Sequence, residues 1–253
     1  RSDTRITDVV ISSARDAIDG LPYIKLIIKK LEDISHVNSV RLRSMKFNSS
    51  PLSYSRAVIN CLGDLNKVRV VNPLRLEIET WFILKEELTL VHEKLTRQLN
   101  NKGITVYCNV PLLGGVNDSD IAIQEIAYAT RQIGIEFHHL YVAGLPVQNK
   151  WNRKFPIDSY DVTDIATMVR REGSGREIPR YVIFTSLGEV DYGLTSSFIN
   201  SRSELKIKLC CFDESYYKGM ENNFSFDKDV EIEDGNPVIQ IPGLIKNNDF
   251  PVS

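Results

Sequence analysis

Six short apolar runs, each followed by a stretch with helical spacing, constrain the fold of this sequence more than any other feature. The runs are rich in β-branched residues, and such alternation is typical of strands joined by crossover helices. They cover residues 6–11, 39–42, 74–80, 104–110, 135–142 and 180–185. The pattern predicts a parallel sheet, and periodicity alone does not decide whether that sheet is open or closed into a barrel.

The stretches between these runs carry helix signals. Pro22 stands at the start of one, serine precedes another, and Gly103 and Gly134 follow two more, as expected for helix starts and stops. After Gly188 the pattern weakens, with further strand-like runs only at 205–212 and 238–241. We therefore expect an α/β fold, with a partial (βα) barrel of about six mostly parallel strands in residues 1–193. Residues 194–253 are predicted to form an irregular carboxyl-terminal extension.

Composition excludes several classes of function. The 253 residues carry a formal net charge of −2, so no basic field indicates nucleic acid as a partner. No apolar run is long enough to span a bilayer, and no signal peptide is visible, so we expect no membrane partner. The spacing of the four cysteines suits neither a zinc site nor a disulfide framework, so we expect no metal site and a reducing, cytoplasmic location.

One loop carries a recognisable motif. Residues 111–118 read P-L-L-G-G-V-N-D, after a predicted strand and before a predicted helix. This segment resembles the L-L-x-G-V-N-D motif of lysine 2,3-aminomutases, which are radical S-adenosylmethionine enzymes. Further segments resemble motifs of the same family in the same order, and they are found at residues 34–44, 80–89, 134–141 and 174–182.

The resemblance implies both a chemistry and a set of site residues. In that family a [4Fe–4S] cluster cleaves S-adenosylmethionine, and the resulting radical starts a 1,2-amino shift carried by pyridoxal phosphate. Asp118 matches an aspartate that holds the distal ammonium group of the substrate. Arg41 and Ser44 match positions that can contact the carboxylate or ribose of the cofactor. The resemblance thus implies a radical SAM isomerase acting on a small amine or amino acid, either as a monomer or as a homo-oligomer.

Each of these residues also has a purely structural interpretation. Asp118 stands where an acid caps a helix or complements its dipole. Arg41 and Ser44 suit a solvent-facing ion pair and a helix cap. His138 and His139 are adjacent in a predicted strand, so they point to opposite faces and do not form a metal pair. Gly114 and its neighbour lack the spacing of a phosphate loop, which favours a tight turn.

The sequence also departs from the family pattern. It contains no C-x-x-x-C-x-x-C motif, and Ser13 and Ala14 stand where relatives have glycines. Asp191 stands where the family has the lysine that binds pyridoxal phosphate, and a carboxylate cannot form a Schiff base. The resemblance alone therefore implies S-adenosylmethionine and a [4Fe–4S] cluster, and we do not expect pyridoxal phosphate. Three alternatives stay open. The first is an enzyme of this family whose full-length form carries the cluster motif, and the second is a catalytically degenerate barrel that serves as a scaffold or binding protein. The third is a different radical reaction on an amine-bearing substrate without pyridoxal phosphate.

Overall fold

The structure is a computed structural model that describes residues 3–66, 74–193, 196–199, 204–210, 212–227 and 230–246. Its main sheet has seven strands, and the recorded pairings are parallel except for the last, between β7 and β8. In spatial order the strands are β1 (Asp8–Ile11), β2 (Ser39–Arg43), β3 (Arg75–Trp81), β4 (Thr105–Pro111), β5 (Glu136–Ala143), β7 (Arg180–Thr185) and β8 (Gly188–Asp191). All six predicted strands are present at nearly the predicted residues, and the predicted fold class is confirmed.

The chain forms two compact units. The first unit comprises residues 1–109, 125–138 and 175–177, and the second comprises residues 110–124, 139–174 and 178–253. Strands β4 and β5 each contribute residues to both units. The boundary predicted after residue 193 falls beside residues 194 and 195, outside the described residues, and stays a prediction.

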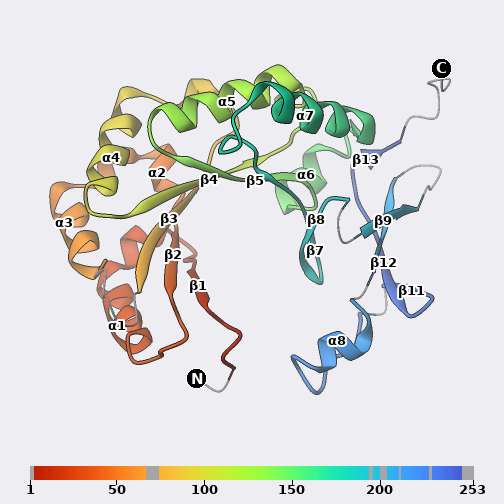
Figure 1. Ribbon diagram of the computed structural model, residues 1–253, viewed down its shortest axis with the longest axis horizontal. Coiled ribbons are helices and arrows are strands. Elements are labelled where there is room, and N and C mark those ends of the chain that lie inside the picture. The colour runs from red at the N-terminus through yellow and green to blue at the C-terminus, as the bar shows by residue number, and fades with distance from the viewer. Residues whose placement is uncertain are drawn as a thin grey trace. The chain divides into compact units, whose positions relative to one another are not determined.

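Helices accompany the strands of the first unit, and Figure 1 shows α1 and α3 alongside β2 and β3. Each helix buries an apolar stripe, such as Ile24 with Ile28 in α1 and Leu95 with Leu99 in α4. These stripes cover the strand face that carries buried Val40 and Leu42. The helical elements are η1 (Ile18–Gly20), α1 (Leu21–Leu31), α2 (Lys46–Ser49), η2 (Pro51–Ser53), α3 (Arg56–Leu65), η3 (Lys85–Glu87), α4 (Leu90–Asn100) and α5 (Asp120–Gln132), which spans both units.

One helix begins later than its periodicity predicts. The pattern predicts a helix over 85–99, whereas α4 begins at Leu90 after a separate 3-10 turn. The carboxylate of Glu87 holds that turn, because its Oε1 accepts hydrogen bonds from the main-chain N–H groups of Ile83 and Leu84 at 2.8 and 2.9 Å. Thr89 is extended, with φ −128° and ψ 169°, and separates the turn from α4.

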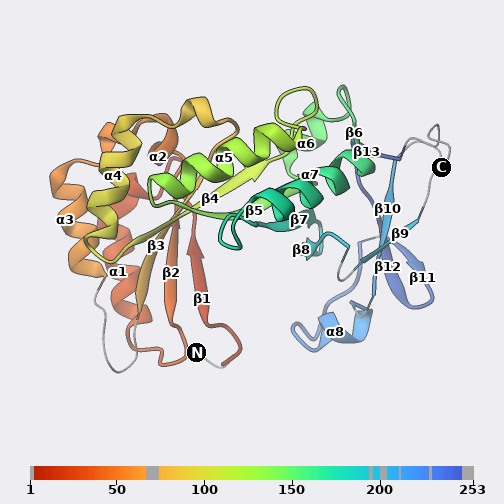
Figure 2. The ribbon, with the colours of Figure 1, turned by 45° about the horizontal axis from the view of Figure 1, so that its top comes forward.

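The second unit contains α6 (Pro146–Trp151), α7 (Ser159–Glu172), α8 (Glu214–Lys218) and two small sheets. An antiparallel four-stranded sheet has the order β11 (Glu231–Glu233), β12 (Asn236–Gln240), β10 (Lys206–Leu209) and β9 (Ser196–Ile199), and Figure 2 shows β10 beside β12. The strands predicted at 205–212 and 238–241 correspond to β10 and β12. Strand β6 (Ile157–Asp158) pairs with β13 (Leu244–Ile245). Within the described ranges, no helix is long and apolar enough to cross a membrane.

Candidate functional site

Six polar side chains form a row across four neighbouring strands of the first unit. They alternate along the strands with the buried apolar residues that face the helices, so they share the opposite face of the sheet. We call this set the charged row, and its members are Arg41, Arg43, Glu77, Glu79, Tyr107 and His138.

Arg41 is the centre of the charged row. Its Nε donates a hydrogen bond to Glu77 Oε2 at 3.0 Å, and its Nη1 lies 3.5 Å from Glu79 Oε2. The guanidinium carbon lies 4.5 Å from the ring centroid of Tyr107, within the range of a cation–π contact. Nη1 also lies 3.4 Å from His138 Nδ1. One guanidinium thus contacts groups from three other strands.

Glu79 joins the two arginines of the charged row. Its Oε1 accepts a hydrogen bond from Arg43 Nε at 2.6 Å, and its other oxygen faces Arg41. The Glu79 side chain is only 4% exposed, whereas that of Arg43 is 38% exposed. The row therefore has a buried acidic end and an accessible basic end. Two carboxylates and two guanidinium groups balance, so the row offers both signs of charge with no net excess.

The pKa of Tyr107 indicates a partly desolvated row. Burial raises the pKa of the Tyr107 phenol, the charge of Glu77 raises it further, and the Arg41 guanidinium opposes both. The ring of Tyr107 lies 4.9 Å from that of His138, so the aromatic end of the row is packed as well. Charged contacts in such surroundings are stronger than in bulk water.

Asn109 follows Tyr107 by two residues on β4 and so shares the face of the charged row. Its side chain is completely buried, and within the described part of the chain neither amide atom has a hydrogen-bond partner. Leaving buried polar atoms unsatisfied costs about 1–3 kcal/mol per group. A polar group at this strand end is therefore available to a water molecule or a ligand.

Ser44 lies directly after β2, but it is fully buried. Its main-chain N–H donates to the carbonyl of Glu79 at 2.8 Å. Its hydroxyl lies against that of Tyr54, whose pKa is raised by burial and partly lowered by this neighbour. Arg41 thus lies in the charged row, and Ser44 lies buried just after the end of the same strand. Their role in cofactor binding stays a prediction.

In the second unit, the motif loop is a tight turn held by main-chain contacts. Asn117 Nδ2 donates to Pro111 O at 3.0 Å, and Asn117 Oδ1 accepts from Leu113 N at 2.7 Å. A Cβ atom on Gly114 would lie 2.0 Å from the carbonyl oxygen of Phe155, so a side chain does not fit there. The interpretation of the two glycines as a tight turn is confirmed, and Asn117 supports that turn.

Asp118 stands at the end of that turn, and its side chain bonds back to the turn rather than forward to the following helix in the described part of the chain. Its Oδ2 accepts a hydrogen bond from Gly115 N at 2.8 Å, while Ser119 Oγ accepts from Ala122 N in the first turn of α5. Asp118 is partly exposed. Burial raises the pKa of Asp161, and the charges of Asp158 and Asp118 raise it further, so Asp118 lies in an acidic neighbourhood. This setting suits a cationic group, and substrate binding by Asp118 stays a prediction.

The residues described here do not fit two of the groups that the family uses. Within the described ranges, no set of three potential ligands could hold a metal ion, and Cys108 is buried on the apolar side of its strand. Asp191 lies on β8 of the β7–β8 hairpin, and its carboxylate accepts a hydrogen bond from Arg180 Nη2 at 2.6 Å. Glu189 beside it is bound by the Tyr141 hydroxyl. That position therefore has no counterpart of the lysine that forms an aldimine, or of the bound phosphate of pyridoxal phosphate.

Sequence reasoning named Arg41 but missed its partners Glu77 and Glu79. A signal was present, because R-x-R at 41–43 and E-x-E at 77–79 stand on neighbouring predicted strands. In the structure Arg41 pairs in register with Glu77, and Arg43 pairs with Glu79. His138 was expected on one face or the other, and the structure places it in the charged row.

Comparison with known proteins supports the resemblance. Glutamate 2,3-aminomutase from Clostridioides difficile (strain 630) is 21% identical over 246 residues, which are 97% of this chain and 52% of that protein. The chain thus spans about half the length of this relative. A domain of a pyruvate-formate lyase-activating enzyme from Bacteroides vulgatus gives a TM-score of 0.44 at 10% identity, over 69% of this chain and 97% of that one. No family model matches the chain. The aminomutase match supports the radical S-adenosylmethionine superfamily without fixing the family.

Proposed function

We propose that this chain is part of a radical S-adenosylmethionine enzyme of the lysine 2,3-aminomutase-like family, and that its charged row binds a small amino acid. The observation that carries the proposal is the row itself, in which paired charges of both signs lie side by side on one strand face. The aminomutase match over nearly the whole chain supports the same assignment. An amino-acid isomerase needs a surface that recognises a zwitterion, and the row has that character.

The charged row can exchange internal ion pairs for ligand ion pairs. A ligand carboxylate can approach Arg43, the most exposed charge of the row, through a bidentate guanidinium contact. A ligand ammonium group can then approach the carboxylate that this contact releases. Because one pair of charges replaces another, the row does not have to bury an unpaired ion.

The cofactors of the proposed reaction are implied by the family alone. A bound cluster with S-adenosylmethionine would supply the radical that abstracts hydrogen. The described residues offer no ligands for the cluster, so we assign no step through it to this chain. The role proposed for the chain's own residues is to hold and orient the amino acid and to exclude water around it.

Calorimetric titration with L-glutamate and L-lysine tests this role. We expect saturable binding of at least one of them, weakened about tenfold or more by Arg43→Gln, because a charge-assisted contact contributes about 1.5–3 kcal/mol. Arg97→Gln is the matched control, since it removes an arginine from a surface pair with Glu93 on α4. Absence of binding at millimolar amino acid, or equal binding by Arg43→Gln, would refute the role.

A second candidate is a catalytically degenerate barrel that serves as a scaffold or binding protein. The observation in its favour is the Asp191–Arg180 ion pair at the position of the family lysine. Anaerobic reconstitution of the full-length protein with iron and sulfide, followed by an assay for S-adenosylmethionine cleavage, separates the two candidates. Cleavage supports the enzyme, and cluster-free protein that still binds amino acids supports the degenerate barrel.

A further inference from the structure

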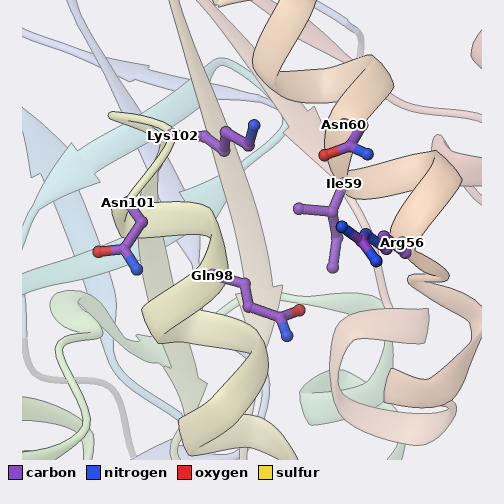
Figure 3. A pocket seen from close by; sticks show the side chains of 6 residues that line it. All are labelled: Arg56, Ile59, Asn60, Gln98, Asn101 and Lys102. Carbon is purple, nitrogen blue, oxygen red and sulfur yellow. The ribbon is translucent and has the colours of Figure 1, made fainter.

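A groove with a volume of about 470 Å³ lies between α3 and α4, among the helices that cover the apolar face of the first unit's strands. It is therefore separate from the charged row, which lies on the opposite strand face. Figure 3 shows the side chains of Gln98, on α4, and Lys102, in the loop after α4, pointing toward α3. The residues that line the groove are Arg56, Ile59, Asn60, Gln98, Asn101 and Lys102.

Both helices present polar side chains to this groove at helical spacing. Positions i, i+3 and i+4 of a helix share a face, and here that face of α3 carries Arg56 and Asn60 beside buried Ile59. The corresponding face of α4 and its end carries Gln98 and Lys102. Two packed helices normally fill such a junction with apolar side chains. Of the described lining residues only Ile59 is apolar, so this junction is open and polar.

The charge of the groove has one sign. Among the described residues, its lining contains a guanidinium, an ammonium and three amides, and no carboxylate. Within the described part of the chain, neither Arg56 nor Lys102 is recorded in an ion pair. Arg56 is also the first residue of α3, where the helix dipole favours anions. At the carboxyl-terminal end of α4, main-chain N–H groups already donate hydrogen bonds to the carbonyl oxygens of Arg97 and Leu99. These bonds satisfy carbonyl groups at the negative end of the helix dipole.

Lys102 reaches the groove because α3 has a glycine opposite it. A Cβ atom on Gly63 would lie 2.7 Å from Lys102 Cδ and 3.1 Å from its Cγ. The aliphatic stem of Lys102 therefore crosses directly over the Gly63 backbone, and its ammonium group is carried to the α3 side (Figure 3). A glycine inside a helix is unfavourable, so its presence in α3 is consistent with a packing role.

We propose that this α3–α4 groove binds a small phosphate-bearing anion. Arg56 and Lys102 supply the two positive charges, and the side-chain amides supply further hydrogen-bond donors to the phosphate oxygens. The volume lies within the range of small-molecule sites. The site is independent of the charged row and of the proposed amino-acid substrate, because it is built from other residues on the opposite side of the sheet.

NMR titration of the protein with inorganic phosphate, AMP and adenosine, at constant ionic strength, tests the proposal. We expect saturable shifts around residues 56–60 and 98–102 with phosphate and AMP. AMP binding tighter than phosphate identifies a phosphate ester as the ligand class, and equal binding identifies the free anion. Shifts with adenosine alone, or shifts that sodium chloride reproduces at equal ionic strength, would overturn the proposal.

Three variants complete the test. Arg56→Gln and Lys102→Gln should each weaken phosphate binding about tenfold, as expected for the loss of one charge-assisted contact. Gly63→Ala keeps both charges and favours the helix, yet it displaces the Lys102 stem, so it should weaken binding while the melting temperature holds or rises. Lys29→Gln, which removes an exposed lysine on α1 that does not line the groove, is the control. Unchanged binding in both Lys102→Gln and Gly63→Ala would refute the site, whether or not the charged row binds amino acids.

Discussion

The charged row of the first unit and the motif loop of the second unit are built from different parts of the chain. In the row, side chains of neighbouring strands satisfy one another, and the backbone beneath them is regular. In the loop, glycines allow close backbone approach, and Asn117 binds main-chain groups. A substitution in the row should therefore change charge and ligand binding. A substitution of a close-packed glycine in the second unit should change whether the backbone can fold at all.

Gly144→Ala tests the backbone part of this comparison, and we expect it to have the largest effect on the free energy of unfolding. Gly144 has φ +99°, and a Cβ there would lie 1.8 Å from the Phe184 carbonyl oxygen. We expect a loss of about 3 kcal/mol or more in the free energy of unfolding, measured by denaturant titration. Gly20→Ala is the control, since no atom of the described residues lies within 4 Å of its added Cβ and φ is −92°. Similar stability of both variants would contradict the expectation.

Glu79→Gln tests the charge part of the comparison, and we expect it to have the second-largest effect on the free energy of unfolding. The change keeps the shape of the side chain but leaves two guanidinium groups with one carboxylate in a partly buried row. We expect a loss of about 3 kcal/mol in the free energy of unfolding. This is near the lower end of the cost of removing one partner from a buried ion pair. Glu93→Gln, which breaks the surface pair with Arg97, should cost about 0.5 kcal/mol or less. Equal costs would mean that the row is no more than a surface network.

Asp118→Asn separates binding from folding in the second unit. Asparagine keeps an oxygen that can accept the hydrogen bond from Gly115 N, so the melting temperature should change little. If Asp118 holds the distal ammonium group of a diamine, binding of L-lysine should weaken about tenfold or more. Binding of L-glutamate, which lacks that group, is the internal control. Loss of stability without loss of lysine binding would show that Asp118 only supports its turn.

The smallest expected effect is on the pH dependence of folding stability, through Asp8 on the first strand. Hydrogen bonds from the hydroxyls of Ser39 and Thr7 lower the pKa of Asp8 below its usual range. A carboxyl whose pKa is lowered on folding stabilises the fold above its unfolded pKa, and that stabilisation is lost as pH falls through the folded pKa. Asp8→Asn should therefore flatten the acid limb of the stability curve slightly, and leave the curve above neutral pH parallel to that of the unchanged protein. An unchanged acid limb would contradict this assignment.

The sequence was sufficient to predict the six parallel strands of the main sheet, because β-branched runs and helix signals are local. It was not sufficient to identify the partners of Arg41, because Glu77 and Glu79 alternate with apolar residues as any half-exposed strand does. Only the register of β2 against β3 shows that these carboxylates meet arginines rather than water. The ion pair between Asp191 and Arg180 was equally hidden, since it depends on an antiparallel return strand that sequence periodicity did not predict.

The ion pairs between β2 and β3 also have a consequence for folding. Side chains in a strand alternate between faces, so a slip of one residue between these strands would move both glutamates to the apolar face beneath the helices. A slip of two residues would leave one arginine and one glutamate of the row without their partners. The repeated pairing of Arg41 with Glu77 and of Arg43 with Glu79 thus selects a single strand alignment during assembly, before any ligand is present.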